Sequence, residues 1–444
     1  MIDQLTNETV ELLQALIRNQ CVNDGSADSG HEDRSARLLR DELEGTGVDL
    51  QMYEPTPGRT SLISRWEGTD PDAPALCLMG HTDVVPVSPE GWTHDPFGGE
   101  LIDGEVWGRG AVDMLNLTSS MAVVYKHLVN SGKRYPGDIV YFAVADEEAG
   151  GRHGAEILVD QEWDALRCDY VLTEFGGIPL HTPAGTNLLV TTAEKGLGWR
   201  RLTVKGQPGH GSMPYGTDNA LIKAAEVVRR LSAYRPTPQL DEMWGRRIKA
   251  MGLPDDLTRR LLDPHAIDEV IAELPEFMAR NVHACTHTTF SPNVIEGGVK
   301  TNVIPDSVTI EVDIRTLPGE EDEDVDNHLR AAIGDLMNYV EVEILQSDRS
   351  TGSPTDNRLW DTVVTAMHAA YPEAQIVPTL VTGGTDSRFF RRRDAVAYGA
   401  GLLSPTVDAG EFFTRFHGHD ERIDVDSLRL TVQLWLDVVD NLWD

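Results

Sequence analysis

A short apolar run that ends in polar side chains reads Ala75-Leu76-Cys77-Leu78-Met79-Gly80-His81-Thr82-Asp83. An apolar run of this length is typical of a strand that is buried on both faces of a sheet. The pattern recurs at 138–148, where three acidic residues follow the run, and at 170–174, where Glu174 follows it. Helical segments alternate with these runs, and this predicts an α/β fold: a mostly parallel mixed sheet flanked by helices. Because sites in such sheets form outside the carboxyl ends of the strands, we expect these polar residues to converge.

Farther along the chain, the alternation of strands and helices gives way to an α+β pattern near residue 195 and resumes near residue 348. Residues 1–194 predict the first part of a catalytic domain, 195–347 an inserted α+β lid or dimerisation domain, and 348–444 the second part of the catalytic domain. Within the insert, strands are expected at 197–205, 288–296 and 303–315, with a bulge near Arg200. Residues 235–285 predict several short helices, which we interpret as an extra insertion. Other helices are expected at 4–18, 32–44, 113–128, 358–370 and 426–442.

Charge and composition exclude several classes of partner. The chain of 444 residues carries 38 basic and 72 acidic residues, a net charge of −34. So acidic a surface repels phosphate backbones and anionic lipid, so we expect neither a nucleic-acid nor a membrane partner. The scattered cysteines indicate reduced thiols, and the N-terminus lacks the pattern of a signal peptide, so a cytoplasmic location is expected.

Five short motifs carry the chemistry, and each has a plainer interpretation. His81-x-Asp83 suits a metal-binding imidazole oriented by a carboxylate, or a polar turn. Asp113, at the start of a helix, suits a carboxylate that bridges two metals, or a helix cap. Glu147 and Glu148 suit a general base beside a metal ligand, or a solvated turn.

The two remaining motifs complete the set. Glu174 follows an apolar strand, and His417 lies in a polar stretch near the C-terminus, where His419 is its rival. Together the motifs supply two histidines and three or four carboxylates, which is a nitrogen and oxygen ligand set without sulfur. Such a set is typical of catalytic zinc or a comparable divalent ion.

With these motifs in place, nearly the whole chain resembles the dinuclear zinc metallopeptidases that include aminoacylase, glutamate carboxypeptidase, succinyl-diaminopimelate desuccinylase and carboxypeptidase S. The resemblance rests on eight motifs that occur in the family's order: 79–87, 107–113, 146–151, Glu174, 206–212, 302–305, 383–388 and 417–421.

The resemblance implies a role for each site residue. Asp113 would bridge two metal ions, His81 and Glu174 would complete one site, and Glu148 and His417 would complete the other. The spacing from His417 to Glu421 matches the family and favours His417 over His419. The ions would be divalent, with zinc expected and cobalt or manganese as alternatives.

The remaining implied roles concern catalysis and substrate. Glu147 would be the general base and Asp83 would orient His81. His210 would help to hold the oxyanion, in the family often from the partner subunit of a homodimer. Substrate-binding groups would be Asn302, Arg315 and Arg388, because an arginine suits a substrate carboxylate.

The expected activity is hydrolysis of an amide bond in an N-acyl amino acid or small peptide. A desuccinylase-type deacylase and a catalytically inactive metal-binding relative are the alternatives. Two departures from the family stand out. Many relatives carry a lysine where this chain has Met114-Leu115-Asn116, and the insertion at 235–285 is of the larger, carboxypeptidase S type. The insertion leaves open whether His210 acts in its own subunit or in its neighbour's.

Overall fold

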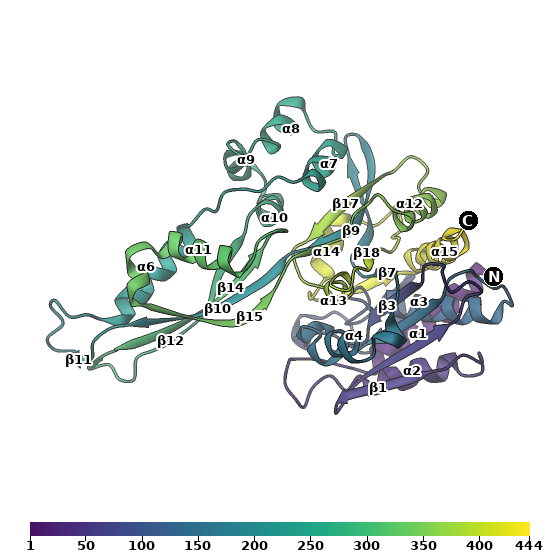
Figure 1. Cartoon of the computed structure of the whole chain (residues 1–444), viewed down its shortest axis with the longest axis horizontal. Helices are drawn as coiled ribbons and strands as arrows, with labels where there is room; N and C mark the ends of the chain where they lie inside the picture. The colour runs from purple at the N-terminus through teal and green to yellow at the C-terminus, as the bar shows by residue number, and fades with distance from the viewer.

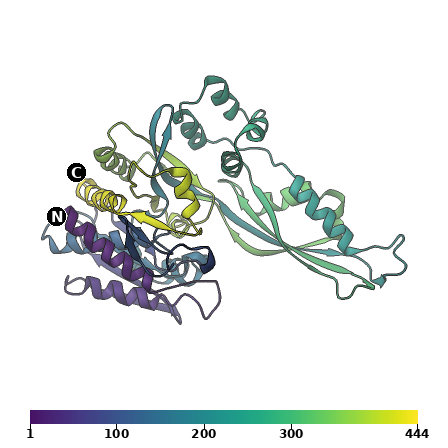
Figure 2. The same cartoon turned by 180° about the vertical axis from the view of Figure 1, so that it is seen from behind.

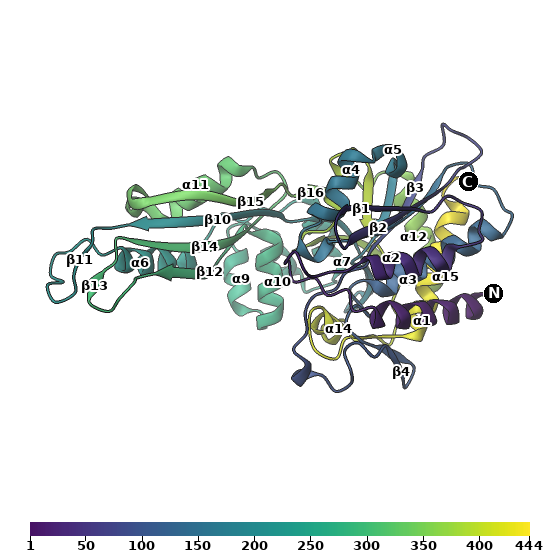
Figure 3. The same cartoon turned by 90° about the horizontal axis from the view of Figure 1, so that it is seen from below.

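The computed structural model describes residues 1–444, apart from the side chain of Phe277. The chain forms a globular part that contains both termini and a long arm that extends away from it (Figure 1). The view from behind and the view from below show the same separation, with strand β11 near the outer end of the arm (Figures 2 and 3). No helix among the described residues combines the length and the apolar character that a membrane crossing requires.

The globular part is built on a ten-stranded sheet whose central strands run in parallel in the order β6-β3-β7-β18. The remaining strands add on both sides of this centre, mostly antiparallel, so the predicted mixed α/β sheet is confirmed. The hairpin of β8 and β9 was not predicted from the sequence. The strands are β1 (Gln51–Thr56), β2 (Arg59–Trp66), β3 (Leu76–His81), β6 (Ile139–Val144), β7 (Tyr170–Thr173), β8 (Gly176–Thr182), β9 (Gly185–Glu194), β16 (Thr351–Gly352), β17 (Gln375–Val381) and β18 (Val396–Gly399).

Helices cover both faces of this sheet, and each face has its own apolar core. One core packs the sheet against α1 (Ile2–Arg18), α2 (Asp33–Leu43), α3 (Leu115–Asn130), α12 (Arg358–Ala370) and α15 (Val425–Asn441). The opposite core uses α4 (Ile157–Gln161), α5 (Trp163–Leu166) and α13 (Ser387–Arg391). Because β3 and β6 are apolar on both faces, they are buried between the two cores, as their uninterrupted apolar runs predict.

The arm consists of a four-stranded antiparallel sheet in the order β12-β14-β10-β15. Its strands are β12 (Thr289–Gly297), β14 (Ser307–Thr316), β10 (Gly196–Lys205) and β15 (Val340–Asp348), and α6 (Ala220–Ala233) and α11 (Asp322–Ile333) cover one face. The register of β10 against β15 shifts between Trp199 and Arg200, which confirms the predicted bulge. The short strands β11 (Gly209–His210) and β13 (Val303–Ile304) pair near the tip.

The insertion at 235–285 forms short helices, as predicted: α7 (Glu242–Ala250), α8 (Asp255–Leu261), α9 (Ile267–Glu273) and α10 (Glu276–Thr286). They pack against the large sheet, because Trp244 and Ile248 share an apolar cluster with Ala193 of β9 and Leu380 of β17. The first predicted domain boundary directly follows the last residue of β9, and the second falls one residue before the end of β15. The division into domains itself stays a prediction.

Candidate metal centre

Five side chains from separate segments meet beyond the carboxyl ends of the parallel strands. His81 ends β3, Glu174 follows β7, Glu148 lies in the turn after β6, and Asp113 precedes α3. His417 reaches the same place because β19 (Arg422–Asp424), just after it, pairs with β5 (Glu105–Trp107), just before the Asp113 loop. The two loops are thereby fixed side by side.

These side chains form two groups that could each hold a metal ion, and the two groups share Asp113. In the first, Nε2 of His81 lies 3.1 Å from Oδ1 of Asp113 and 3.7 Å from Oε2 of Glu174. In the second, Nε2 of His417 lies 3.3 Å from Oδ2 of Asp113 and 3.2 Å from Oε2 of Glu148. Each oxygen of Asp113 therefore faces a different histidine, which is the arrangement that a bridging carboxylate requires.

The charge of the cluster fits divalent cations. Burial raises the pKa of Glu174 to about 8 and that of Glu148 to about 7, and the negative charge of Asp113 contributes to both shifts. Oε1 of Glu148 is buried and has no hydrogen-bond partner among the described residues. Carboxylates held this close need a cation to remain ionised, and nitrogen and oxygen donors suit zinc, cobalt or manganese.

Asp83 stands behind both ligand groups and is fully buried. Nδ1 of His81 lies 3.0 Å from the backbone oxygen of Asp83 and 3.6 Å from its Oδ1. The Asp83 carboxylate also accepts hydrogen bonds from the backbone N–H groups of Glu147, at 3.3 Å, and Glu148, at 3.1 Å. One residue therefore contacts both a histidine ligand and the turn that carries Glu147.

Glu147 lies in this turn beside the other carboxylates. Burial raises its pKa well above the usual range, and the charge of Glu174 raises it further. A carboxylate with a raised pKa at the edge of a metal centre is suited to receive and return a proton.

Glu421 is an important residue whose role the sequence did not reveal. It is fully buried and accepts hydrogen bonds from the backbone N–H groups of Val112, at 2.7 Å, and Asp113, at 3.0 Å. Arg109 donates to its other oxygen at 2.6 Å. Glu421 therefore fixes the backbone of the shared ligand, and the only signal for it in the sequence was its spacing from His417.

Glu421→Gln is expected to weaken metal binding or activity about 10- to 100-fold, because it disturbs the backbone that orients Asp113. Calorimetric titration of the metal-free protein with Zn²⁺ measures the effect. The matched control is Glu411→Gln, which removes another glutamate that is paired with arginines, Arg415 and Arg422, at the surface. Equal metal affinity in the two variants would contradict the role assigned to Glu421.

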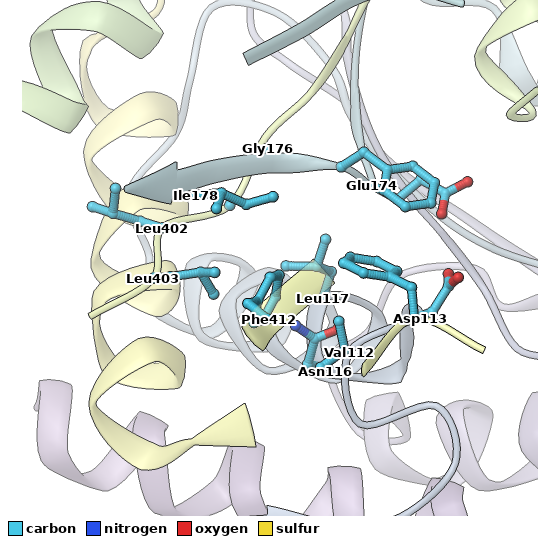
Figure 4. Close-up of a pocket in the computed structure, with 13 residues that line it drawn as sticks. Val112, Asp113, Asn116, Leu117, Glu174, Gly176, Ile178, Leu402, Leu403 and Phe412 are labelled. Carbon is cyan, nitrogen blue, oxygen red and sulfur yellow. The ribbon is translucent and has the colours of Figure 1, made fainter. Parts of the chain in front are cut away.

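An apolar wall lies behind the ligands. A small cavity of about 20 Å³ is lined by Leu117, Ile178 and Phe412, and by the flanks of Asp113 and Glu174. The carboxylates of the two ligands point away from this cavity (Figure 4). The space is comparable to that of one water molecule, so the wall restricts access to the ligands from this side.

The four other predicted side chains lie outside the ligand cluster. His210 and Asn302 are exposed; His210 belongs to β11 and Asn302 directly precedes β13, with which β11 pairs. β11 lies near the outer end of the arm (Figure 1). Nδ1 of His210 lies 2.7 Å from Oγ of Ser212. Arg315 pairs with Asp313 at 2.7 Å on the arm sheet. Arg388 is buried beside the Glu147 turn and donates to the backbone oxygens of Thr385 and Gly150. Of these four residues, all of which the structure describes, only Arg388 lies next to the turn that carries Glu147 within one chain.

Two possible metal-binding groups that share an aspartate, at the rim of a mostly parallel sheet, form an arrangement that metal-dependent hydrolases with two ions use. Residues 77–441 match the peptidase family M20/M25/M40, and the chain belongs to this family. The predicted family and the predicted hydrolase class are thus confirmed.

Individual relatives agree with this assignment. The chain is 29 % identical to aminoacylase-1 of Sus scrofa over 393 residues, which are 87 % of this chain and 84 % of that protein. Its fold is similar to that of the M20 family metallo-carboxypeptidase Sso-CP2 from Sulfolobus solfataricus, with a TM-score of 0.73, 16 % identity and coverage of 98 % and 99 % of the two chains. It is also similar to human carnosine dipeptidase 1, with a TM-score of 0.70, 17 % identity and coverage of 99 % and 97 %.

Proposed function

We propose that this chain hydrolyses the amide bond of an N-acyl amino acid or a small peptide with the help of two divalent metal ions. The observation that carries the proposal is the shared Asp113, whose two oxygens face two separate ligand groups. Zinc is the expected metal, and cobalt and manganese have the same ligand preferences.

The residues of the chain divide the work. When bound, the ions act as Lewis acids and lower the pKa of water. His81, Asp113 and Glu174 would hold one ion, and Asp113, Glu148 and His417 the other. Glu147 would take a proton from the attacking water and return it to the leaving amine. Arg388 remains our candidate for a substrate carboxylate, together with Asn302 and Arg315 on the arm.

A screen for hydrolysis tests the activity. The metal-loaded protein is incubated with N-acetyl amino acids, dipeptides and N-succinyl-diaminopimelate, and release of amine is measured. Turnover of acetylated amino acids or dipeptides supports the proposal, and turnover of the succinyl compound alone would favour the desuccinylase alternative. Binding of two ions without turnover of any compound would favour an inactive relative. A cytoplasmic location stays a prediction.

We further propose a homodimer formed through the arm. Large apolar side chains are exposed on α6, where Ile222 is 69 % exposed, and on β12, where Ile295 is 54 % exposed. β12 is also the edge strand of the arm sheet, and an exposed apolar edge favours pairing with another chain. His210 lies near the tip of the same arm. In such a dimer, His210 of one chain would lie at the metal centre of the other chain.

Mixing two inactive variants tests this arrangement. His210→Ala is expected to lower kcat about 10²- to 10³-fold, the usual effect of losing an oxyanion donor. The variant is then mixed in equal amounts with a Glu147→Gln variant, and the subunits are allowed to exchange. Half of the dimers are then mixed, and each has one site that combines an intact Glu147 with an intact His210 from the other chain. Because one quarter of all sites are intact, about a quarter of wild-type activity should return. If the mixture stays inactive although the subunits exchange, His210 does not act across the interface.

A further inference from the structure

The turn that carries Glu147 is held in an unusual backbone conformation. Asp146, the residue before it, has φ of +72°, in the left-handed region. A residue other than glycine keeps this conformation when its surroundings fix it. Oδ2 of Asp146 accepts a hydrogen bond from the backbone N–H of His153 at 2.8 Å, which joins the start of the turn to the segment that follows it.

Asn23 connects this turn to the loop after β3. Its Nδ2 donates to Oδ2 of Asp83 at 2.8 Å and to Oδ1 of Asp146 at 3.3 Å. Its backbone is fixed to the same loop, because the N–H of Asn23 donates to the oxygen of Val84 at 2.9 Å. One buried amide thus joins the two carboxylates that shape the segments carrying His81 and Glu148.

Arg59 holds Asn23 in place from the other side. It is buried at the start of β2 and donates to Oδ1 of Asn23 at 3.0 Å and to Oε1 of Glu32 at 2.7 Å. Its Nε lies 3.7 Å from Oδ1 of Asp146. Glu32 in turn lies 3.3 Å from the backbone N–H of Asp146. The guanidinium therefore orients the amide of Asn23 so that its N–H groups face Asp83 and Asp146.

We propose that Arg59 and Asn23 are positioning residues that fix the Asp146–Glu148 turn and so place the base and one ligand of the second metal group. The inference rests on the proposed function, since it assigns the roles of base and ligand to Glu147 and Glu148. Among the described residues, the side-chain hydrogen bonds and ion pairs of Arg59 and Asn23 go to each other, to Asp83, Asp146 and Glu32 and to the loop at 25–29, and none joins a metal-ligand side chain. Their effect passes through Asp83 and Asp146.

Loss of these hydrogen bonds should affect the metal affinities of the two ligand groups to different extents. Glu148 belongs to the group with His417, whereas His81 and Glu174 of the other group are carried by the ends of β3 and β7. Loss of Arg59 releases the turn and leaves these strands in the core. Asp83 also contacts His81, but at the shorter distance of 3.0 Å through its backbone oxygen, which belongs to the segment that continues from β3. The second ion should therefore lose more affinity than the first.

Titration of the metal-free, full-length protein with Zn²⁺ tests the inference without relying on turnover. Arg59→Met is expected to weaken the binding of one of the two ions about 10- to 100-fold, the usual effect of removing a residue that supports a ligand. On the substrate found by the screen, kcat should fall by a similar factor with KM nearly unchanged. Arg59→Lys, which keeps the charge but fewer hydrogen bonds, should recover part of both losses.

Two further variants make the test selective. Arg65→Met removes another arginine of β2. Nη1 of Arg65 lies 2.6 Å from Oδ2 of Asp138, and this pair is remote from the metal centre. The variant should leave metal binding and kcat unchanged. Asn23→Ala removes the amide without leaving a buried charge unpaired, and should reproduce the loss of one ion if Arg59→Met fails to fold.

The possible results separate this inference from the proposed function. Selective loss of one ion with partial recovery by lysine supports it. Unchanged binding of both ions in Arg59→Met and Asn23→Ala, or an equal loss of both ions, would overturn it. Failure of the wild-type protein to hydrolyse any compound would count against the proposed function instead, because the titration of ions does not depend on hydrolysis.

Discussion

Glu147→Gln is expected to lower kcat about 10³- to 10⁴-fold, which corresponds to an increase of about 4 to 5.5 kcal/mol in the barrier. Glutamine has the same shape but cannot take a proton from the attacking water or return one to the leaving amine. Neither ligand group includes Glu147, so both ions should still bind. Steady-state kinetics and Zn²⁺ titration on the same preparation measure the two effects.

A surface substitution of the same kind is the control. Glu373→Gln changes an exposed glutamate and should leave both kcat and metal binding unchanged. A Glu147→Gln variant that keeps more than a tenth of wild-type kcat would assign the base to another residue.

Asp113→Asn is expected to abolish the binding of both ions near neutral pH and to reduce activity about 10⁴-fold, because the ions supply several kcal/mol of stabilisation to the reaction. The neutral amide keeps the size of the side chain but removes the one negative charge that both ligand groups share. Loss of both ions from a single substitution is the specific signature of a bridge.

The control is a substitution of a ligand that belongs to one group only, because it should affect one ion and not both. Glu174→Gln should weaken mainly one ion, since Glu174 belongs to one group. Metal content measured after dialysis distinguishes the two variants. If Asp113→Asn lost one ion and kept the other, Asp113 would be an ordinary ligand.

Three of the five possible ligands were predictable because they follow recognisable strands, whereas the assignment of all five to two ions came from the resemblance to the family. His81, Glu148 and Glu174 come directly after apolar runs, and the ends of neighbouring parallel strands lie at one edge of a sheet. The predicted residues of both groups are brought together in the structure. His417 was harder, since its position depends on the pairing of β19 with β5 across more than 300 residues.

Supporting residues were not predictable in the same way. Asn23, Arg59 and Glu421 lie in segments whose local pattern indicates a turn, a strand start and a polar loop, and their roles arise from contacts between distant parts of the chain. The placement of α7 against β17 has the same origin, because it depends on which apolar faces remain uncovered once the large sheet has formed.

Anomalous diffraction from crystals grown with Zn²⁺, recorded above and below the zinc absorption edge, tests the central claim directly. The account predicts two peaks that flank Asp113, one in contact with His81 and Glu174 and the other with Glu148 and His417. A single peak, or peaks that do not share Asp113, would contradict it.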